Sequence, residues 1–468
     1  MVRLSGQRLN ILPKSPMSNA AVTTVILAAG RSTRMKSSTP KALHQIAGRP
    51  MLGHVLATVE SLDNMRVVLV LAPGMDEVAK YAKATARNLD IAVQDKPLGT
   101  GHAVRAAETL VPSGEGVVLI IFGDTPLVRT ETLADMIGAC RAETPVIVLG
   151  FEARDPAAYG RLVLNADGSL ARIVERKDAS PEELAITLCN GGAMAVRAEH
   201  LFRLLSRMTN ENASGEYYLT DVVELARAEG LDCAVIRAPE EDIQGVNSRA
   251  DLAAVEAEMQ RRLRKRAMDG GVTLADPETV YLSADTVFGQ DVTVGQNVVF
   301  GPGVEVASNV TIKPFCHIEG GRIDEGAQIG PFARIRPGSE IGRDVHIGNF
   351  VETKKAKIEA GAKVNHLSYI GDARVGAKAN IGAGTITCNY DGFNKHHTDI
   401  GAGAFIGSNS SLVAPVKIGD GAYTGSGSVI TKDVPADALA VERSKHFEKP
   451  GWAAAFRAKH AGMKKAGE

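Results

Sequence analysis

The sequence has few aromatic residues, no long apolar run and almost no net charge. Aromatic side chains make up 4% of the 468 residues, which is typical of a thin core filled by isoleucine and valine. No stretch approaches the ~18 consecutive apolar residues of a membrane span, so we expect no membrane-embedded segment. The net charge of −1 gives no dominant field for nucleic acid or a membrane surface, and we expect neither as a partner.

Paired cysteines and a secretory signal are also missing. The five cysteines form no CxxC pair and none needs a disulfide, so we expect a reduced, cytoplasmic location. The first twenty residues lack the 7–15-residue apolar block of a signal peptide. We expect them to be a disordered extension, with Met17 as an alternative start.

What the sequence has instead is a six-residue rhythm between about Thr286 and Lys432. A period of six fits neither a helix nor an alternating strand, but it is typical of a solenoid. Three hexads close one triangular coil with the apolar residue inside, which predicts a left-handed parallel β-helix of hexapeptide repeats. The alternative is a β-sandwich with coincidental spacing. The inward positions include Phe288, Val294, Phe300, Val306, Ile312, Ile318, Ile323, Ile329, Ile335, Ile341, Ile347, Ile358, Val364, Ile370, Val375, Ile381, Ile400, Ile406, Leu412, Ile418 and Ile430.

The first half of the chain alternates apolar strands with helical patterns. Strands are expected at 23–29, 66–71, 117–122 and 145–151, and helical patterns at 51–61 and 101–110. This alternation predicts a doubly wound, mostly parallel, Rossmann-like α/β domain, whose ligands bind beyond the carboxyl ends of the strands.

We divide the chain into an extension (1–20), an α/β domain (21–247), a linker helix (248–270), a β-helix (271–434) and a tail (435–468). Ser248 is the expected helix cap, and basic residues in the last turn suit the helix dipole. The Arg/Lys run of this helix is interpreted as a solvated face, with RNA binding as the alternative.

A basic, glycine-led loop follows the first strand. It carries Arg31, Arg34, Lys36 and Lys41 within twelve residues, as a polyphosphate site requires. The first strand is followed in order by the motifs LAAG (27–30), TRM (33–35) and PK (40–41). This order resembles the nucleotide-sugar pyrophosphorylases, which join a nucleoside triphosphate to a sugar 1-phosphate. Ser32 stands where that family usually has glycine.

The resemblance implies a role for each matching residue. Arg34 and Lys41 would neutralise charge during transfer, and Asp124 with Asn247 would hold Mg²⁺, which accepts carboxylate and amide oxygens. The implied contacts of UTP and the UDP-sugar are Leu27, Gly30, Lys41, Gln94, Gly99, Thr100, Gly160, Glu175, Asn190 and Asn247.

Two irregular stretches interrupt the hexad rhythm. The first lies around 334–338 and 349–355, and the second spans 380–395. The motifs in and around them are NFVETKKAKI (349–358), HLSYIGDA (366–373), NIGAGTITCNYDGFNKHHT (380–398) and GSNSSLVAP (407–415). With the first-half motifs, they resemble the bifunctional family that unites N-acetylglucosamine-1-phosphate uridylyltransferase with glucosamine-1-phosphate N-acetyltransferase. The resemblance covers roughly residues 23–452.

This second resemblance implies a second site. His366 would be the general base for attack of the sugar amine on the acetyl thioester, because imidazoles titrate near neutral pH. Lys395 would reach across a subunit boundary. The implied hexosamine-phosphate contacts are Arg336, Lys354, Tyr369 and Asn380, and those of acetyl-CoA are Ala383, Asn389, Tyr390, Ser408, Ser426 and Arg443.

We therefore expect a cytoplasmic homotrimer that acetylates glucosamine 1-phosphate and then forms UDP-N-acetylglucosamine, an envelope precursor, from UTP. One alternative is a single-activity pyrophosphorylase with a regulatory β-helix. Another is an inactive scaffold built from the same two domains.

Overall fold

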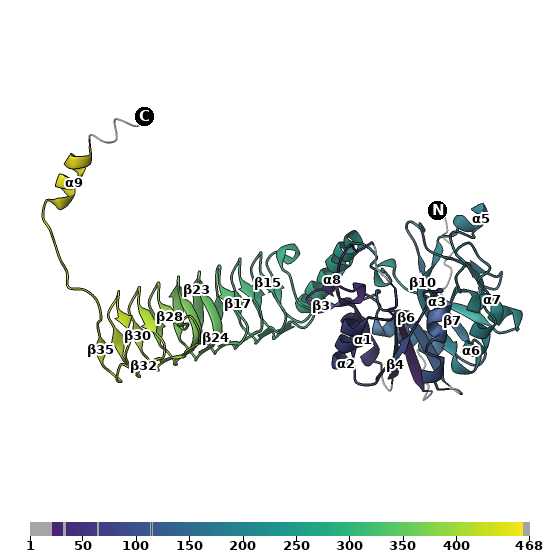
Figure 1. The fold of residues 1–468 in the computed structure, drawn as a ribbon, viewed down its shortest axis with the longest axis horizontal. Coiled ribbons are helices and arrows are strands. Elements are labelled where there is room, and N and C mark those ends of the chain that lie inside the picture. The colour runs from purple at the N-terminus through teal and green to yellow at the C-terminus, as the bar shows by residue number, and fades with distance from the viewer. Residues whose placement is uncertain (1–20, 31–33, 63–64, 113, 115, 462–468) are drawn as a thin grey trace, which may run out of the picture. The chain divides into compact units, whose positions relative to one another are not determined.

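The computed structural model describes residues 21–30, 34–62, 65–112, 114 and 116–461 (Figure 1). The chain divides into two compact units between Leu263 and Arg264, a division that falls inside the long helix α8 (Arg249–Asp269). The predicted N-terminal extension and Ser32 lie outside the described residues.

The first unit is built on one mixed sheet with strand order β11-β7-β10-β6-β1-β4-β5. Neighbours are parallel except β10, which is antiparallel to β6 and β7, so the predicted mostly parallel α/β architecture is confirmed. Its strands are β1 (Val22–Leu27), β4 (Met65–Leu71), β5 (Leu89–Val93), β6 (Val117–Phe122), β7 (Val146–Glu152), β10 (Leu188–Arg197) and β11 (Cys233–Arg237). In addition, β8 (Arg161–Leu164) pairs with β10, and β9 (Leu170–Val174) pairs with β8. A separate hairpin consists of β2 (Gln45–Ile46) and β3 (Arg49–Pro50).

Helices flank this sheet. They are α1 (Met51–Glu60), α2 (Asp76–Thr85), α3 (Thr100–Arg105), α4 (Thr130–Ala139), α5 (Pro181–Leu184), α6 (Ala198–Ser206) and α7 (Asp221–Ala228), with 3-10 turns η1 (Lys41–Leu43), η2 (Glu108–Leu110) and η3 (Glu240–Asp242). The predicted helix over 101–110 is wrong beyond Arg105. There Ala107 N–H bonds to Val104 O, three residues back, and the tighter turn keeps Ala107 fully buried.

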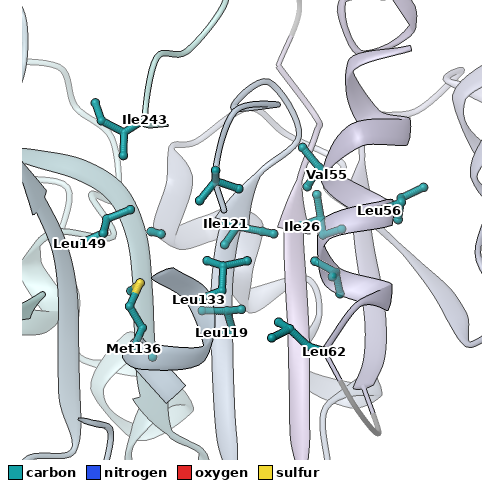
Figure 2. Packing of buried hydrophobic residues seen from close by; sticks show 14 of the residues in the cluster. Ile26, Val55, Leu56, Leu62, Leu119, Ile121, Leu133, Met136, Leu149 and Ile243 are labelled. Atoms are coloured by element: carbon teal, nitrogen blue, oxygen red, sulfur yellow. The ribbon is translucent and has the colours of Figure 1, made fainter. Parts of the chain in front are cut away.

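Alternating side chains of the central strands fill two cores, one on each face of the sheet, as a period of two requires. Ile26 of β1 and Ile121 of β6 point to one face, while Val25 and Ile120 point to the other. Figure 2 shows the first core, with Ile26, Leu119 and Ile121 from the sheet beside Val55 and Leu56 of α1 and Leu133 and Met136 of α4. The sheet is thereby buried on both sides, and its carboxyl edge carries the loops of the first site.

The first part of α8 is fixed to this unit by charge. The buried Asp242 carboxylate pairs with Arg129 (2.8 Å) and Arg262 (2.6 Å), and burial raises its pKa despite the two guanidinium groups. At the helix start, Ser248 Oγ accepts from Asp251 N–H, as the predicted cap requires. The Asp251 carboxylate in turn accepts from the backbone N–H groups of Asn247 and Ser248 (2.8 Å each), so the cap orients the loop bearing Asn247.

The second unit is a parallel β-helix whose coils stack strand upon strand in three columns. One column contains β12 (Thr273–Leu274), β14 (Thr293–Val294), β17 (Thr311–Ile312), β20 (Gln328–Ile329), β23 (His346–Asn349), β25 (Lys363–His366), β27 (Asn380–Ile381), β30 (Phe405–Ile406), β33 (Tyr423–Thr424) and β35 (Leu439–Ala440). The second contains β13 (Val287–Phe288), β16 (Glu305–Val306), β19 (Gly321–Ile323), β22 (Ser339–Ile341), β24 (Glu352–Ile358), β26 (Tyr369–Val375), β29 (Thr398–Ile400) and β32 (Val416–Ile418). The third contains β15 (Val299–Phe300), β18 (His317–Ile318), β21 (Arg334–Ile335), the first residues of β24 and β26, β28 (Ile386–Cys388), β31 (Ser411–Val413) and β34 (Val429–Ile430).

The hexad residues lie inside this β-helix and stack on one another from coil to coil. In the first column Val294, Ile312, Ile329 and Ile347 are in register, and each is at most 1% exposed. The interior is therefore a continuous thin core made mostly of isoleucine and valine, as the scarcity of aromatics predicted, with Phe300 as a buried aromatic exception. The 3-10 turn η4 (Pro277–Thr279) and the tail helix α9 (Trp452–His460) complete the unit.

Two candidate active sites

The first unit has a cavity of about 590 Å³ at the carboxyl edge of its sheet. Leu27 and Gly30 line it from the end of β1, Ala72 and Pro73 from the end of β4, and Asp124 from the loop after β6. Lys41, Gln94, Gly99 and Thr100 also line it. This is the edge at which ligands of doubly wound sheets bind.

Four polar side chains from three separate loops converge beside this cavity. The Lys41 ammonium forms an ion pair with Asp124 and donates to Asn247 Oδ1 (2.9 Å), and Arg34 donates to the same oxygen (3.0 Å). Lys41 and Asp124 are partly buried, so their charges interact in a medium less screening than water. Segments more than two hundred residues apart thus form one polar cluster.

The donors of this cluster fit a hard divalent cation. Asp124 and Asn247 already place a carboxylate oxygen and an amide oxygen around one cationic group, the Lys41 ammonium. Mg²⁺ accepts such oxygens and completes its shell with waters and phosphate oxygens. In the described part of the chain, no three His, Cys, Asp or Glu side chains lie together as a metal site, so a cation here would rely on few protein ligands.

The loop between β5 and α3 forms the far wall of the cavity. Gly99 has φ +106°, and a Cβ there would come within 2.6 Å of Tyr217 O, so only glycine fits. Tyr217 N–H donates to Leu98 O (2.8 Å), and Gly101 N–H donates to Tyr217 O (2.9 Å). The segment around Tyr217 therefore holds this wall in place.

The expected sugar-binding residues form a separate group that does not line the cavity. Asn190 N–H donates to Gly160 O (2.8 Å), and the Glu175 carboxylate lies against Gly160 and accepts from Thr220 Oγ1 (3.2 Å). Burial raises the pKa of Glu175, and it raises that of the nearby Asp221 to about 6. The sequence reasoning missed Ala72, Pro73 and Glu216, which line the cavity. The position of Ala72-Pro73 directly after a strand was an available signal.

The second site lies on the outer surface of the β-helix, where His366 ends β25. In register, Asn349 of β23 stands beside His366, and Asn349 Oδ1 lies 2.8 Å from His366 Nδ1. Because an amide oxygen can only accept, Nδ1 carries the proton in the neutral imidazole, which leaves Nε2 with its lone pair. The sequence reasoning did not assign Asn349 this orienting contact.

Two further expected residues stand next to this pair. Tyr369 of β26 is in register with Glu352 of β24, and Glu352 accepts from Arg336 (2.7 Å). Lys354, on the same strand as Glu352, is half-buried, as is Asn380. A guanidinium and an ammonium thus lie on the coils that surround His366.

The expected acetyl-CoA contacts follow one corner of the β-helix. A Cβ on Gly382 or on Gly407 would come within 2.5 Å of the backbone nitrogens of Ser408 and Ser426, respectively, so glycine allows these coils to approach closely. Arg443 Nη1 donates to Ser426 O (2.6 Å). Ala383, Ser408 and Ser426 follow these strand ends on successive coils.

The second break in the rhythm is a loop that leaves the coil after Cys388. Residues 390–395 are exposed, and Lys395 Nζ lies 4.1 Å from the centre of the Tyr390 ring. Asn389 behaves differently, because it is 6% exposed and its amide donates to Asp372 of the same chain. The loop therefore has a fixed base and an exposed tip.

Together, the fold and the two sites define a transferase of two parts, a nucleotidyltransferase followed by a hexapeptide-repeat acyltransferase. Residues 24–212 match the MobA-like NTP transferase domain, and residues 320–355 and 397–432 match the bacterial transferase hexapeptide of six repeats. These repeats form the left-handed β-helix that the sequence predicted.

Relatives named "Bifunctional protein GlmU" match nearly the whole chain. Those of Parvibaculum lavamentivorans and Paramagnetospirillum magneticum are 68% and 54% identical, and each alignment covers 96% of this chain and 99% of the relative. That of Azorhizobium caulinodans is 55% identical over 94% of this chain and 98% of its own length.

The chain belongs to the family of bifunctional GlmU proteins. It has the two activities that the sequence predicted: acetylation of glucosamine 1-phosphate, and uridylyl transfer to N-acetylglucosamine 1-phosphate.

Proposed function

We propose that uridylyl transfer takes place in the cavity of the first unit and acetyl transfer on the β-helix around His366. The observation that carries the first assignment is the convergence of Arg34, Lys41, Asp124 and Asn247. The observation that carries the second is the Asn349–His366 contact. The reactions follow in the order acetylation, then nucleotide transfer.

In the first site the protein positions its reactants and neutralises charge. The phosphate oxygen of N-acetylglucosamine 1-phosphate attacks the α-phosphorus of UTP in line, and pyrophosphate leaves. Arg34 and Lys41 balance the negative charge of the triphosphate. Mg²⁺, held by Asp124 and Asn247, supplies further charge neutralisation when it is bound.

For UTP we propose contacts with Leu27, Gly30, Gln94, Gly99 and Thr100, which all line the cavity. Gly160, Glu175 and Asn190 form the sugar subsite. Their shared hydrogen bonds support a common role, and Gly192, two residues beyond Asn190, lies beside Phe122 at the cavity wall.

In the second site His366 acts as the general base. Its free Nε2 takes a proton from the amine of glucosamine 1-phosphate as the nitrogen attacks the acetyl thioester, and the thiol of coenzyme A leaves. Arg336, Lys354, Tyr369 and Asn380 bind the hexosamine phosphate. Acetyl-CoA lies along the corner formed by Ala383, Ser408 and Ser426, with contacts from Asn389, Tyr390 and Arg443.

The chain works as a homotrimer in the cytoplasm. The five cysteines, all of them in the described part, are free thiols, which suits a reducing compartment. None of the helices in the described residues is long and apolar enough to cross a bilayer. Lys395, at the exposed loop tip, reaches the acetyl site of a neighbouring subunit.

An exposed apolar ladder supports the trimer. Phe315, Phe332 and Phe350 stack at one corner of successive coils, with ring centres 4.9 Å and 5.1 Å apart, and Leu367 continues the ladder. These four residues are between 45% and 62% exposed in the single chain, although monomers rarely leave a continuous apolar patch open. Leu367 adjoins His366, so a subunit packed on the ladder would also border the acetyl site.

Changing Phe332 to aspartate should separate the trimer and lower acetyl transfer at least about tenfold, because a charge would enter an apolar contact. Folding should persist, since Phe332 has φ 56° and Asn297 and Asn409 adopt similar angles on other coils. Light scattering and both activity assays provide the test.

Val287→Asp is the matched control, because Val287 is 58% exposed but lies outside the ladder. A trimeric Phe332→Asp protein with normal acetyl transfer would rule out this interface.

The two activities can be assayed separately. Thiol release from acetyl-CoA with glucosamine 1-phosphate reports the β-helix, and pyrophosphate release from UTP with N-acetylglucosamine 1-phosphate reports the cavity. We expect release of both products. Pyrophosphate release without thiol release would favour the single-activity alternative, and the absence of both products would favour the scaffold.

A further inference from the structure

The Gln94 side chain lies between the cavity and a histidine outside it. Gln94 follows β5, lines the cavity and is only 7% exposed. Its Nε2 donates to Gly99 O (3.1 Å) and lies 3.3 Å from Nδ1 of His102 in α3. No other hydrogen bond of this amide is found among the described residues.

These contacts determine which way the amide faces. A primary amide nitrogen has two hydrogens, and Gly99 O and a neutral His102 Nδ1 can accept one each. The reversed amide would place Oε1 against Gly99 O, an acceptor facing an acceptor. Both donors are therefore occupied within the protein, and Oε1 is the end left for a ligand in the cavity.

We propose that His102 is a positioning residue that fixes the Gln94 amide with its oxygen toward the nucleotide base, and thereby makes the site prefer uracil to cytosine. The inference rests on the proposed UTP site. Uracil carries an N–H at N3 that an amide oxygen accepts, whereas cytosine has a lone pair at N3 that the oxygen repels. A buried acceptor that cannot also donate discriminates strongly against a ligand without the matching N–H donor.

His102 does not line the nucleotide cavity. It borders a separate surface hollow of about 540 Å³, where the charged and titratable neighbours are Asp95, Lys96, Arg105, Glu108 and Tyr217. Its ring centre is 6.4 Å from that of Tyr217. His102 therefore acts on a ligand in the cavity through Gln94 rather than by direct contact.

Protonation of His102 would undo this arrangement. An imidazolium carries hydrogen on both nitrogens, so Nδ1–H would meet the Gln94 NH₂, a donor facing a donor. A donor at this position should therefore weaken UTP binding.

The test compares His102→Leu with His102→Asn. Leucine removes the acceptor, whereas the asparagine Oδ1 can replace Nδ1. We measure kcat and KM for UTP and CTP. For His102→Leu we expect the UTP-over-CTP preference to fall about tenfold, mainly through KM, the usual effect of losing one hydrogen bond. For His102→Asn we expect the preference to persist.

An unchanged kcat at saturating UTP reports folding of the first unit, and Arg105→Gln controls for charge at the same hollow. Wild-type selectivity in His102→Leu, or selectivity lost as fully in His102→Asn as in His102→Leu, would overturn the inference. Gln94→Leu distinguishes the role of His102 from that of Gln94 itself. Selectivity lost with Gln94→Leu but kept with His102→Leu refutes only the role of His102, whereas selectivity kept in both refutes base recognition by Gln94.

Discussion

Asp124→Asn should abolish UDP-N-acetylglucosamine formation while acetyl transfer continues at the wild-type rate. Asp124 contributes the only carboxylate in the cluster with Arg34, Lys41 and Asn247. Asparagine keeps the size of the side chain but removes the negative charge that holds Lys41 and would hold Mg²⁺. Pyrophosphate release, measured across a range of Mg²⁺ concentrations, gives the expected loss.

The matched control is Asp90→Asn. Asp90 lies on the edge strand β5, away from the cluster, and pairs with Arg66 of β4. Both activities should therefore be retained in this variant. If Asp124→Asn lost acetyl transfer as well, without a change in solubility, the two sites would not be independent. Near-normal pyrophosphate release would show that Asp124 has only a structural role.

His366→Ala should impair the other activity of the chain. Acetyl transfer should fall by about 10²–10⁴-fold, the usual contribution of general base catalysis. The side chain is exposed, so its removal leaves no buried cavity. Its Nδ1 is held by Asn349, and the variant loses this contact together with the oriented Nε2. Thiol release measured between pH 6 and 9 gives the size of the effect, and pyrophosphate release should stay unchanged.

His346→Ala serves as the control, because His346 belongs to the neighbouring strand β23 and has no proposed role. Asn349→Ala should produce a smaller loss than His366→Ala, since water can replace its contact with Nδ1. Near wild-type thiol release by His366→Ala throughout the pH range would make His366 a structural residue.

The β-helix was predictable in detail because one inward side chain every six residues specifies both strand and corner. Three hexads make a coil of 18 residues, and Asn349 and His366 lie on adjacent coils 17 residues apart because this coil is one residue shorter. Their hydrogen bond was not predictable, because it depends on side-chain rotamers at an irregular strand end.

The first site was predictable only in part. The strand-end rule correctly located the cavity, but sequence spacing could not show that Gly160, Glu175 and Asn190 form a group outside its lining. The Gln94–His102 contact depends on how α3 packs beside the loop after β5, and the Phe315–Phe350 ladder depends on positive φ angles at the coil corners. Such features arise from tertiary geometry rather than from any local pattern.

The most direct test of two independent sites in one chain is a mixing measurement. Asp124→Asn and His366→Ala proteins are supplied, alone and in equal amounts, with glucosamine 1-phosphate, acetyl-CoA and UTP, and UDP-N-acetylglucosamine is quantified. Neither variant alone should form it at a substantial rate. The mixture should, because N-acetylglucosamine 1-phosphate made by one protein diffuses to the other. A mixture that forms no UDP-sugar, although each variant retains its remaining half-reaction, would contradict the account.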